Sequence, residues 1–359
     1  MEGIVQISVS SEKRPLISRN LRTANSEFRT RPNGEFLFLH LTRTSVGTLL
    51  TPCSLIHYNT IIPYLPLMNR LERWHRSGKS FNWNSHRIFY HEEGRGEALL
   101  LLHGFPTASW DWHKLWPFLV ERFHVIAPDF LGFGFSDKPR RYDYTIARQA
   151  DVVEELMGCL GIQGFHILAH DFGDTVAQEL LARHNGKEGS FGAGLSIQSL
   201  CLLNGGLFPE AHSPRLVQHL MASPIGWLLS PFLSKRTLAR NFNAIFGPYT
   251  PPEEVEVDEF WSLITHNQGK KVMHLLIRYM AERRTFRERW VGALQQATIP
   301  IRLIDGAADP ISGRHLAEHY LQLIPDPDVV LLEGIGHYPQ TEAPELVLQH
   351  FLEFVEGKR

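Results

Sequence analysis

From residue 80 onward, short apolar runs alternate with amphipathic stretches. The apolar runs are EALLLLHG, HVIAPDF, FHILAHD, IQSLCLLNGG, IPIRLIDG and VVLLEGIGH. Runs of this length without polar alternation are typical of strands that are buried on both faces of a parallel sheet. The stretches with helical periodicity are TIARQADVVEELMGCLG, GDTVAQELLARH, SGRHLAEHYLQLI and PELVLQHFLEFVEG. Together they predict an α/β fold, with a mostly parallel sheet and helices on both faces.

The alternation breaks between about residues 207 and 296. That segment has the pattern of helices and loops, with Trp227, Trp261 and Trp290, and shows no clear buried strand. We interpret it as a helical cap over the site, inserted late into the sheet. The predicted core therefore comprises residues 71–206 and 296–359, and the cap residues 207–295. A hairpin turning at Asn84-Ser85 is expected to begin the sheet.

Residues 1–70 differ in composition from the rest. Residues 44–69 carry no Lys, Arg, Asp or Glu and are long enough to span a bilayer, but Pro52, Pro63 and Pro66 interrupt them. We expect residues 1–70 to form a disordered or loosely packed extension. A membrane-associating segment and a cleaved targeting peptide are the alternatives.

Composition narrows the classes of function. A net charge of -2 without a basic excess argues against a nucleic-acid partner. The three cysteines are scattered, which favours free thiols and a reducing, cytoplasmic location. The alternative is membrane association through residues 44–69. Neither a metal-ligand spacing nor a phosphate-binding glycine motif occurs, so we expect no metal and no cofactor.

The run AHDFGD joins an apolar strand to a helix and has the form of a nucleophile elbow. Ala169 and Gly173 are small, as the sharp turn requires, and Asp171 stands at the position of the nucleophile. The start of a helix also favours an anion. The alternative interpretation is that Asp171 only caps that helix.

Further polar residues follow other predicted strands. Asp309 follows IPIRLIDG and His337 follows the last strand, so the chain order is nucleophile, acid, base. Because the carboxyl ends of parallel strands form the binding edge of such a sheet, we expect Asp171, Asp309 and His337 to meet there. The backbone N–H groups of Phe105 and Phe172 are predicted to form an oxyanion hole.

These motifs resemble those of α/β hydrolases with an aspartate nucleophile, the epoxide hydrolases and haloalkane dehalogenases. The resemblance covers roughly residues 72–355 and is carried by HGFPTASWDW, PDFLGFGFSDKP, AHDFGD, GAADP and GIGHYPQTEAPE. It implies an α/β-hydrolase fold with a helical cap and a small apolar substrate.

An aspartate nucleophile suits displacement at an sp³ carbon, because attack there gives an ester of the enzyme that His337 can hydrolyse with water. Attack on an acyl group would instead give an anhydride. The resemblance implies that cap tyrosines protonate an epoxide oxygen, and Tyr279 and Tyr249 are the candidates. We therefore predict an epoxide hydrolase, with a haloalkane dehalogenase or a non-catalytic binding protein as alternatives.

Two residues depart from the usual HDWG elbow of epoxide hydrolases. Phe172 has no side-chain donor for a halide, and neither has Phe105, which weakens the dehalogenase alternative unless Trp227, Trp261 or Trp290 substitutes from the cap. Asp174 stands where a small residue is common. We expect it to favour the helix N-terminus rather than to raise the pKa of Asp171.

Overall fold

The computed structural model describes residues 69–357. Eight strands form one sheet in the order β1-β2-β4-β3-β5-β6-β7-β8. Their bounds are Lys79–Trp83 (β1), His86–Gly94 (β2), Ala98–Leu102 (β3), His124–Pro128 (β4), Gly164–His170 (β5), Ser196–Leu203 (β6), Ile301–Gly306 (β7) and Val329–Leu332 (β8). The pairs β1–β2 and β2–β4 are antiparallel, and the other pairs are parallel. The sheet is mostly parallel, as predicted, and Asn84 and Ser85 form the first turn with positive φ.

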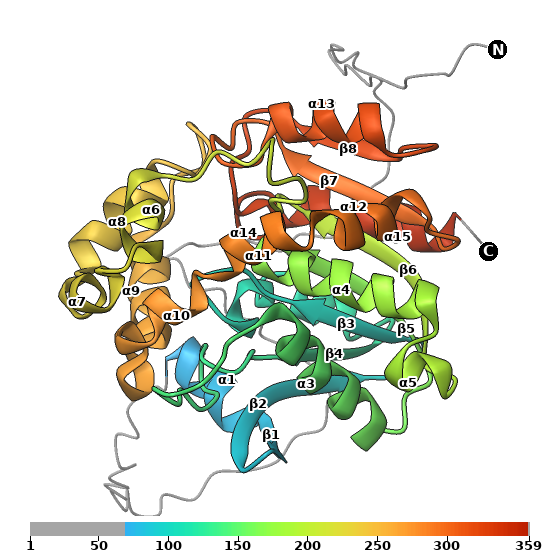
Figure 1. Cartoon of the computed structure of the whole chain (residues 1–359), viewed down its shortest axis with the longest axis horizontal. Coiled ribbons are helices and arrows are strands. Elements are labelled where there is room, and N and C mark those ends of the chain that lie inside the picture. Colours follow the sequence, from blue (N-terminus) through green and yellow to red (C-terminus); the bar gives the residue numbers. More distant parts are fainter. Residues whose placement is uncertain (1–68, 358–359) are drawn as a thin grey trace, which may run out of the picture. The chain divides into compact units, whose positions relative to one another are not determined.

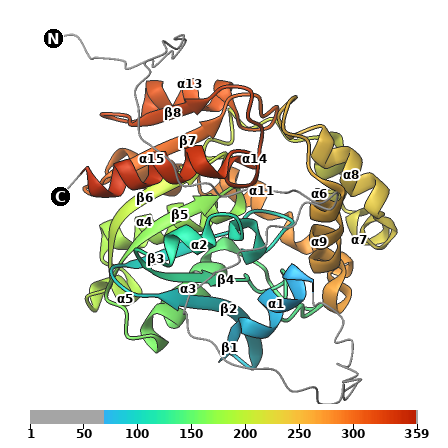
Figure 2. The ribbon, with the colours of Figure 1, turned by 180° about the vertical axis from the view of Figure 1, so that it is seen from behind.

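Both faces of the sheet are covered (Figures 1 and 2). On one face lie α3 (Ile146–Cys159), α4 (Phe172–Gly186), α5 (Gly189–Gly192), α12 (Arg287–Gln295) and α13 (Arg314–Leu323). On the other lie α1 (Arg70–Ser77), η1 (Ser109–Trp112), α2 (Trp116–Leu119), α14 (Pro339–Glu342) and α15 (Pro344–Glu356). Leu100 of β3 faces the first layer and Leu101 the second, and both are fully buried. This is why the predicted strands show no polar alternation.

The cap connects β6 to the second part of the core. Its helices are α6 (Leu216–Ala222), α7 (Gly226–Leu229), η2 (Ser230–Phe232), α8 (Lys235–Asn243), α9 (Glu254–Thr265), η3 (His266–Lys271), α10 (Met273–Leu276) and α11 (Tyr279–Thr285). Figure 1 shows α6 to α10 gathered beyond one end of the sheet.

The cap ends earlier than the predicted residue 295. Helix α12 packs on α4 of the core, where the indole N–H of Trp290 and the guanidinium of Arg289 both donate to Glu179, each at 2.8 Å. Because Trp290 and Val291 are buried against the core, α12 belongs to the core and the cap ends before it. A helical pattern in sequence does not show which layer its apolar face will cover.

The predicted extension, residues 1–70, lies almost wholly outside the described residues. Its disorder, membrane association or cleavage therefore stay predictions. Among residues 69–357, no helix has both the length and the apolar character that crossing a membrane requires. Cys159 and Cys201 are free thiols, as expected.

Candidate active site

Asp171 lies at the tip of the turn between β5 and α4. Its backbone has φ 46° and ψ -99°, a conformation that L-residues adopt only when the surrounding structure enforces it. A Cβ on Gly173 would lie 2.3 Å from the carbonyl oxygen of Leu102, so this position requires glycine. The Asp171 side chain makes no capping hydrogen bond to α4. The helix-cap interpretation therefore does not describe this carboxylate.

The two oxygens of the Asp171 carboxylate have different partners. The Phe105 N–H donates to Oδ2 at 3.2 Å. The Tyr279 hydroxyl and the Arg283 Nη2 each lie 3.4 Å from Oδ1. Burial opposes the charge on Asp171, but Arg283 and then His337 outweigh it and hold its pKa below the usual value. The carboxylate is therefore ionised, with one oxygen held by the backbone and the other facing cap side chains.

A hydrogen-bonded loop after β3 positions the Phe105 N–H. The Phe130 N–H donates to His103 Nε2 at 3.1 Å, so the proton of His103 is on Nδ1 and is donated to the Gly104 carbonyl at 2.8 Å. The Gly104 N–H donates in turn to Asp111 Oδ2 at 3.3 Å. The backbone on both sides of Gly104 is thus fixed, which holds the next amide toward Asp171.

Asp309 and His337 meet at the ends of β7 and β8. His337 Nδ1 lies 2.7 Å from Asp309 Oδ2. Burial disfavours the imidazolium, but Asp309 and then Asp171 outweigh it and raise the pKa of His337 to about 9. The carboxylate is fixed by Ser312 and by the Asn204 amide, which donates to Oδ2 at 3.1 Å. His337 is therefore oriented by Asp309 and carries a proton at neutral pH.

Asp171, His337 and Phe105 face an apolar pocket with an empty volume of about 770 Å³. Most of its wall comes from the cap, including Val217, Met221, Leu233, Leu238, Phe242 and Ile264. An ionised carboxylate, a histidine oriented by a second carboxylate and the backbone N–H of Phe105 thus lie along one apolar pocket, whereas Phe172, the other predicted oxyanion donor, is not among the lining residues. Such an arrangement is of the kind that can carry out a displacement followed by hydrolysis.

Comparison with known proteins identifies the family of this chain. Residues 97–344 match the alpha/beta hydrolase fold family. The chain belongs to that family. Mesoderm-specific transcript protein of Mus musculus is 44% identical over 325 residues, which cover 87% of this chain and 95% of the relative. LipZ of Mycobacterium tuberculosis is 34% identical and covers 77% of this chain and 94% of its own length.

Solved structures agree on the fold of this α/β hydrolase. The epoxide hydrolase CorEH has a TM-score of 0.65 at 22% identity, covering 79% of this chain and 99% of that chain. The haloalkane dehalogenase DbeA from Bradyrhizobium elkani also has a TM-score of 0.65 at 22% identity, covering 78% of this chain and 98% of that chain. At such identity the likeness shows the fold alone.

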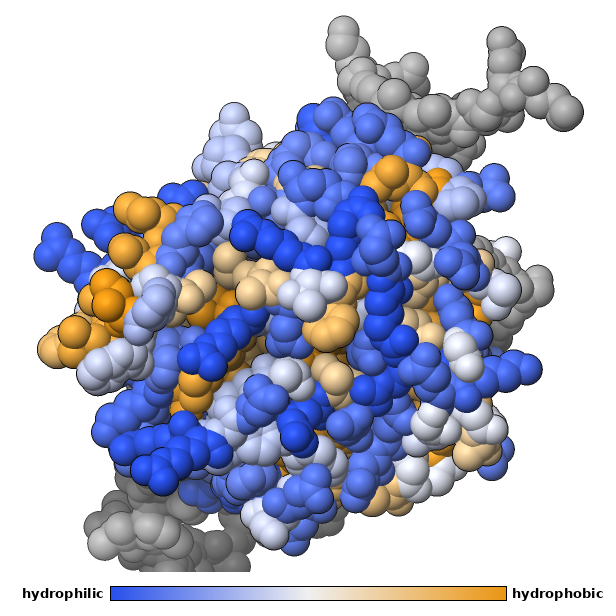
Figure 3. Space-filling view, viewed as in Figure 1, coloured by the Kyte–Doolittle hydropathy of each residue, from blue (hydrophilic) through white to orange (hydrophobic). Residues whose placement is uncertain are grey.

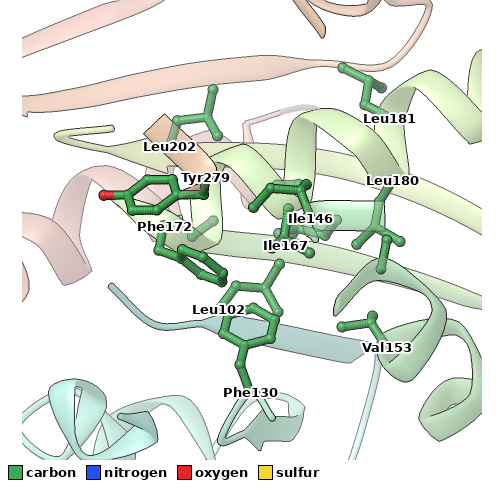
Figure 4. Packing of buried hydrophobic residues seen from close by; sticks show 14 of the residues in the cluster. Leu102, Phe130, Ile146, Val153, Ile167, Phe172, Leu180, Leu181, Leu202 and Tyr279 are labelled. Carbon is green, nitrogen blue, oxygen red and sulfur yellow. The ribbon is translucent and has the colours of Figure 1, made fainter. Parts of the chain in front are cut away.

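The two predicted cap tyrosines lie in different places in this α/β hydrolase. Tyr279 begins α11 and is fully buried, its ring centroid 4.9 Å from that of Phe172 (Figure 4). Neither tyrosine is among the residues that line the pocket. Tyr279 contacts Asp171, which does line it, whereas Tyr249 is 88% exposed, so the assignment of Tyr249 as a proton donor is wrong. The cause is the Glu342 carboxylate, which accepts hydrogen bonds from the Gly247 N–H and the Thr250 hydroxyl and fixes the loop with Tyr249 outward.

The three cap tryptophans that could donate to a halide also lie in different places. Trp261 lines the pocket. Trp227 is exposed on α7, and Trp290 is bonded to Glu179 in the core. Phe172 contributes no side-chain donor, and its ring packs among Phe130, Phe133 and Tyr279. Only Trp261 of the three candidates is therefore placed to contact a bound substrate.

Asp174 does not act as the charged helix-terminal residue that we expected. It is fully buried, and burial followed by the negative charge of Asp171 raises its pKa well above the usual value. Arg283 has the larger effect on Asp171, whose pKa is lowered instead. Burial and the charge of Asp171 thus favour the protonated form of Asp174, while Arg283 favours the charged form of Asp171.

No role was predicted from the sequence for Arg283, Asn204 or Ser312. Arg283 follows Tyr279 by four residues, and that spacing on α11 could have indicated a shared face. Asn204 directly follows β6, as Asp309 follows β7, and its place after a strand was the available signal. Within residues 69–357, no group of three or more His, Cys, Asp and Glu side chains could hold a metal ion.

Proposed function

We propose that this α/β hydrolase opens epoxides of small apolar compounds through a covalent ester on Asp171. The observation that carries the proposal is the placement of the Tyr279 hydroxyl, 3.4 Å from Oδ1 of Asp171. The Phe105 N–H donates to Oδ2 at 3.2 Å, and Oδ1 accepts only the longer contacts from Tyr279 and Arg283, so we assign the attack to Oδ1. Displacement at carbon places the leaving oxygen on the side of the carbon away from Oδ1. The Tyr279 hydroxyl must therefore turn from Oδ1 to that oxygen when an epoxide binds, and it is then the general acid that ring opening requires.

In the first step, Oδ1 of Asp171 attacks an epoxide carbon and the ring C–O bond breaks. The released oxygen takes the proton of the Tyr279 hydroxyl, leaving a phenolate beside the Arg283 guanidinium, whose centre lies 4.6 Å from the ring centroid. Burial and the charge of Asp171 raise the pKa of Tyr279 in the free enzyme. Because the ester is neutral, its formation removes the negative charge of Asp171 at the moment when the proton leaves Tyr279. The pKa of Tyr279 is then no longer raised by that charge.

In the second step, His337 takes a proton from water, which attacks Cγ of Asp171. Negative charge then develops on Oδ2, where the Phe105 N–H already donates. Asp171 is one of the groups that raise the pKa of His337 to about 9. Esterification neutralises Asp171, so the pKa of His337 falls, and the proton that His337 loses restores the Tyr279 hydroxyl. The neutral imidazole is then the base. Collapse of the intermediate passes the proton taken from water to the departing oxygen, which releases a diol, and the proton left on the Asp171 carboxyl returns to His337.

The test is to trap the intermediate in His337→Gln, which retains Asp171 but lacks the base. The full chain is incubated with a panel of alkyl and aryl epoxides, and its intact mass and its Asp171 peptide are measured. We expect an adduct of the mass of the epoxide on Asp171. The control is Asp171→Asn in the same background, which should give no adduct. Tight binding without an adduct on Asp171 would instead favour a non-catalytic binding protein.

One observation favours a second candidate, haloalkane dehalogenase. Trp261 lines the pocket, and an indole N–H is a donor that can stabilise a leaving halide. A panel of haloalkanes in the same trapping experiment distinguishes the two. Displacement by Asp171 would then add the alkyl group alone and release halide. Adducts from haloalkanes and none from epoxides would favour this candidate.

A further inference from the structure

One face of the cap exposes an unusual density of large apolar side chains. Half of the large hydrophobic residues that are exposed in the described part of the chain fall within the short segment 216–232. They are Leu216, Leu220, Ile225, Trp227, Leu228 and Phe232, and we refer to them as the cap face. Figure 3 shows apolar side chains gathered at this edge of the molecule, over α6 to α8. An exposed apolar patch of this kind marks an interaction surface.

The segment that carries the cap face has charges of one sign, and Asp258 of the neighbouring helix α9 pairs with Lys235. No Asp or Glu occurs in residues 211–252, whereas that stretch contains Arg215, Lys235, Arg236 and Arg240. Arg236 and Arg240 are exposed and four residues apart, so they share one side of α8. Leu238 and Phe242 occupy the other side, where they line the pocket. Apolar side chains next to basic ones are typical of helices that lie in the interface of an anionic membrane.

The cap face and the pocket share one helical wall. Helix α6 gives Val217 and Met221 to the pocket and exposes Leu216 and Leu220. Neither side of this helix is therefore strongly polar, unlike a helix that only covers a core. A surface bound to the cap face would therefore be separated from the apolar pocket by the thickness of one helix.

We propose that the cap face docks on a lipid bilayer that carries anionic headgroups. Trp227, Phe232 and the leucines enter the headgroup region, and Arg236 and Arg240 contact the phosphates and carboxylates of the lipids. The apolar pocket then lies one helix away from the region where apolar substrates partition. This docking does not depend on which bond the site opens, so the proposed function and the docking can fail separately.

The experiment measures binding of the full chain to vesicles of phosphatidylcholine with and without phosphatidylserine. Amide hydrogen exchange is followed in the same samples. We expect binding to the anionic vesicles and slower exchange across residues 216–236. Phe232→Ser should weaken binding about tenfold. The double change Arg236→Gln with Arg240→Gln should weaken it about 25-fold, or about fivefold for each charge.

A matched pair controls for general surface effects. Leu220 on the cap face and Leu346 on α15 are both 44% exposed. Leu220→Ser should weaken vesicle binding and Leu346→Ser should leave it unchanged, while both keep the midpoint of thermal unfolding of the native chain.

Three results would overturn the proposal. Vesicle binding that persists in Phe232→Ser without slower exchange in residues 216–236 would place the contact elsewhere in the chain. Slow exchange without vesicles that increases with protein concentration would show that a second copy covers the face. Slow exchange without vesicles at every concentration would show that the chain covers the face itself.

Discussion

The guanidinium of Arg283 lies 3.4 Å from Oδ1 of Asp171, on the side of the carboxylate opposite the Phe105 amide. Its position is fixed by Thr175, which accepts from Nε at 2.8 Å, and by the Asp171 carbonyl, which accepts from Nη2 at 3.1 Å. A buried cation thus favours the charged form of a buried carboxylate. It also lies beside the Tyr279 ring, where the proposed phenolate develops.

Replacing Arg283 should shift the pH dependence of ester formation. In Arg283→Met, burial is no longer offset by the nearest cation, so the pKa of Asp171 rises and the acid limb of the rate moves to higher pH. We also expect a loss of about 3–5 kcal/mol in the free energy of unfolding, because one partner of a buried ion pair is removed. The measurement is the single-turnover rate of ester formation from the lowest pH at which each protein stays folded up to pH 9, because the native acid limb lies below the usual pKa of an aspartate.

Two further variants, Arg283→Lys and Arg278→Met, show whether the positive charge at position 283 or a general structural change shifts the pH dependence. Lysine keeps the positive charge, so its acid limb should lie between those of the native chain and Arg283→Met. Arg278 is exposed and lies just before the same helix, and its replacement should leave the profile unchanged. An unchanged acid limb in a folded Arg283→Met protein would show that Arg283 does not control the ionisation of Asp171.

Tyr279→Phe should lower kcat for an epoxide by about 10²–10⁴-fold, the usual contribution of a general acid. The ring and its packing on Phe172 remain, so the free energy of unfolding should change little. Tyr249→Phe is the matched control, because that hydroxyl belongs to an exposed side chain. Equal turnover by the two variants would refute the role of Tyr279. Undiminished haloalkane turnover by Tyr279→Phe would agree with a halide leaving group, which needs no proton.

The different positions of Tyr249 and Tyr279 show which parts of the site could be predicted from the sequence and which could not. The strand ends and the elbow were predictable, because a buried parallel strand and a sharp turn require residue types that are visible in the chain. Tyr249 and Tyr279 both lie in segments without such requirements. Their side chains are placed by distant partners, Glu342 holding the loop of Tyr249 and Asp171 lying beside the Tyr279 hydroxyl.

The pKa shifts of Asp171 and Asp174 were also hard to predict, because they depend on burial and on residues that are distant in the sequence. The raised pKa of Asp174 depends on its burial and on Asp171. The ionised state of Asp171 depends on Arg283, which is 112 positions away in the chain. Local sequence indicates that two carboxyl groups are close, but not which of them a third residue keeps charged.

The glycine of the elbow gives a test of stability with an internal control. A methyl group on Gly173 would lie 2.3 Å from the backbone oxygen of Leu102, which cannot move without disturbing β3. Gly173→Ala should therefore destabilise the chain by about 1–3 kcal/mol and displace Asp171. Gly158 lies in α3, where a methyl group would meet nothing within 4 Å, so Gly158→Ala should stabilise by about 0.5–1 kcal/mol. Chemical denaturation measures both, and equal effects would contradict the crowding at the elbow.

The charge on His337 should appear as a pH dependence of stability. Its pKa in the folded chain is raised to about 9 from an ordinary value of 6.5. A raised pKa stabilises the folded state fully below the unfolded value, and the contribution is lost as the pH rises through the folded value. The native chain should therefore exceed His337→Gln in free energy of unfolding by most at pH 6 and by least above pH 9.

Denaturant unfolding of both proteins at pH 6, 7.5 and 9.5 measures this difference. Titrations of groups distant from His337 occur in both proteins and largely cancel. Asp309 is the exception, because His337 is the largest of the influences that lower its pKa against burial, so part of the measured difference belongs to the Asp309–His337 pair. A difference that grows with pH would mean that His337 is buried neutral. The imidazole would then be a base already in the free enzyme, and esterification of Asp171 would not be needed to release it.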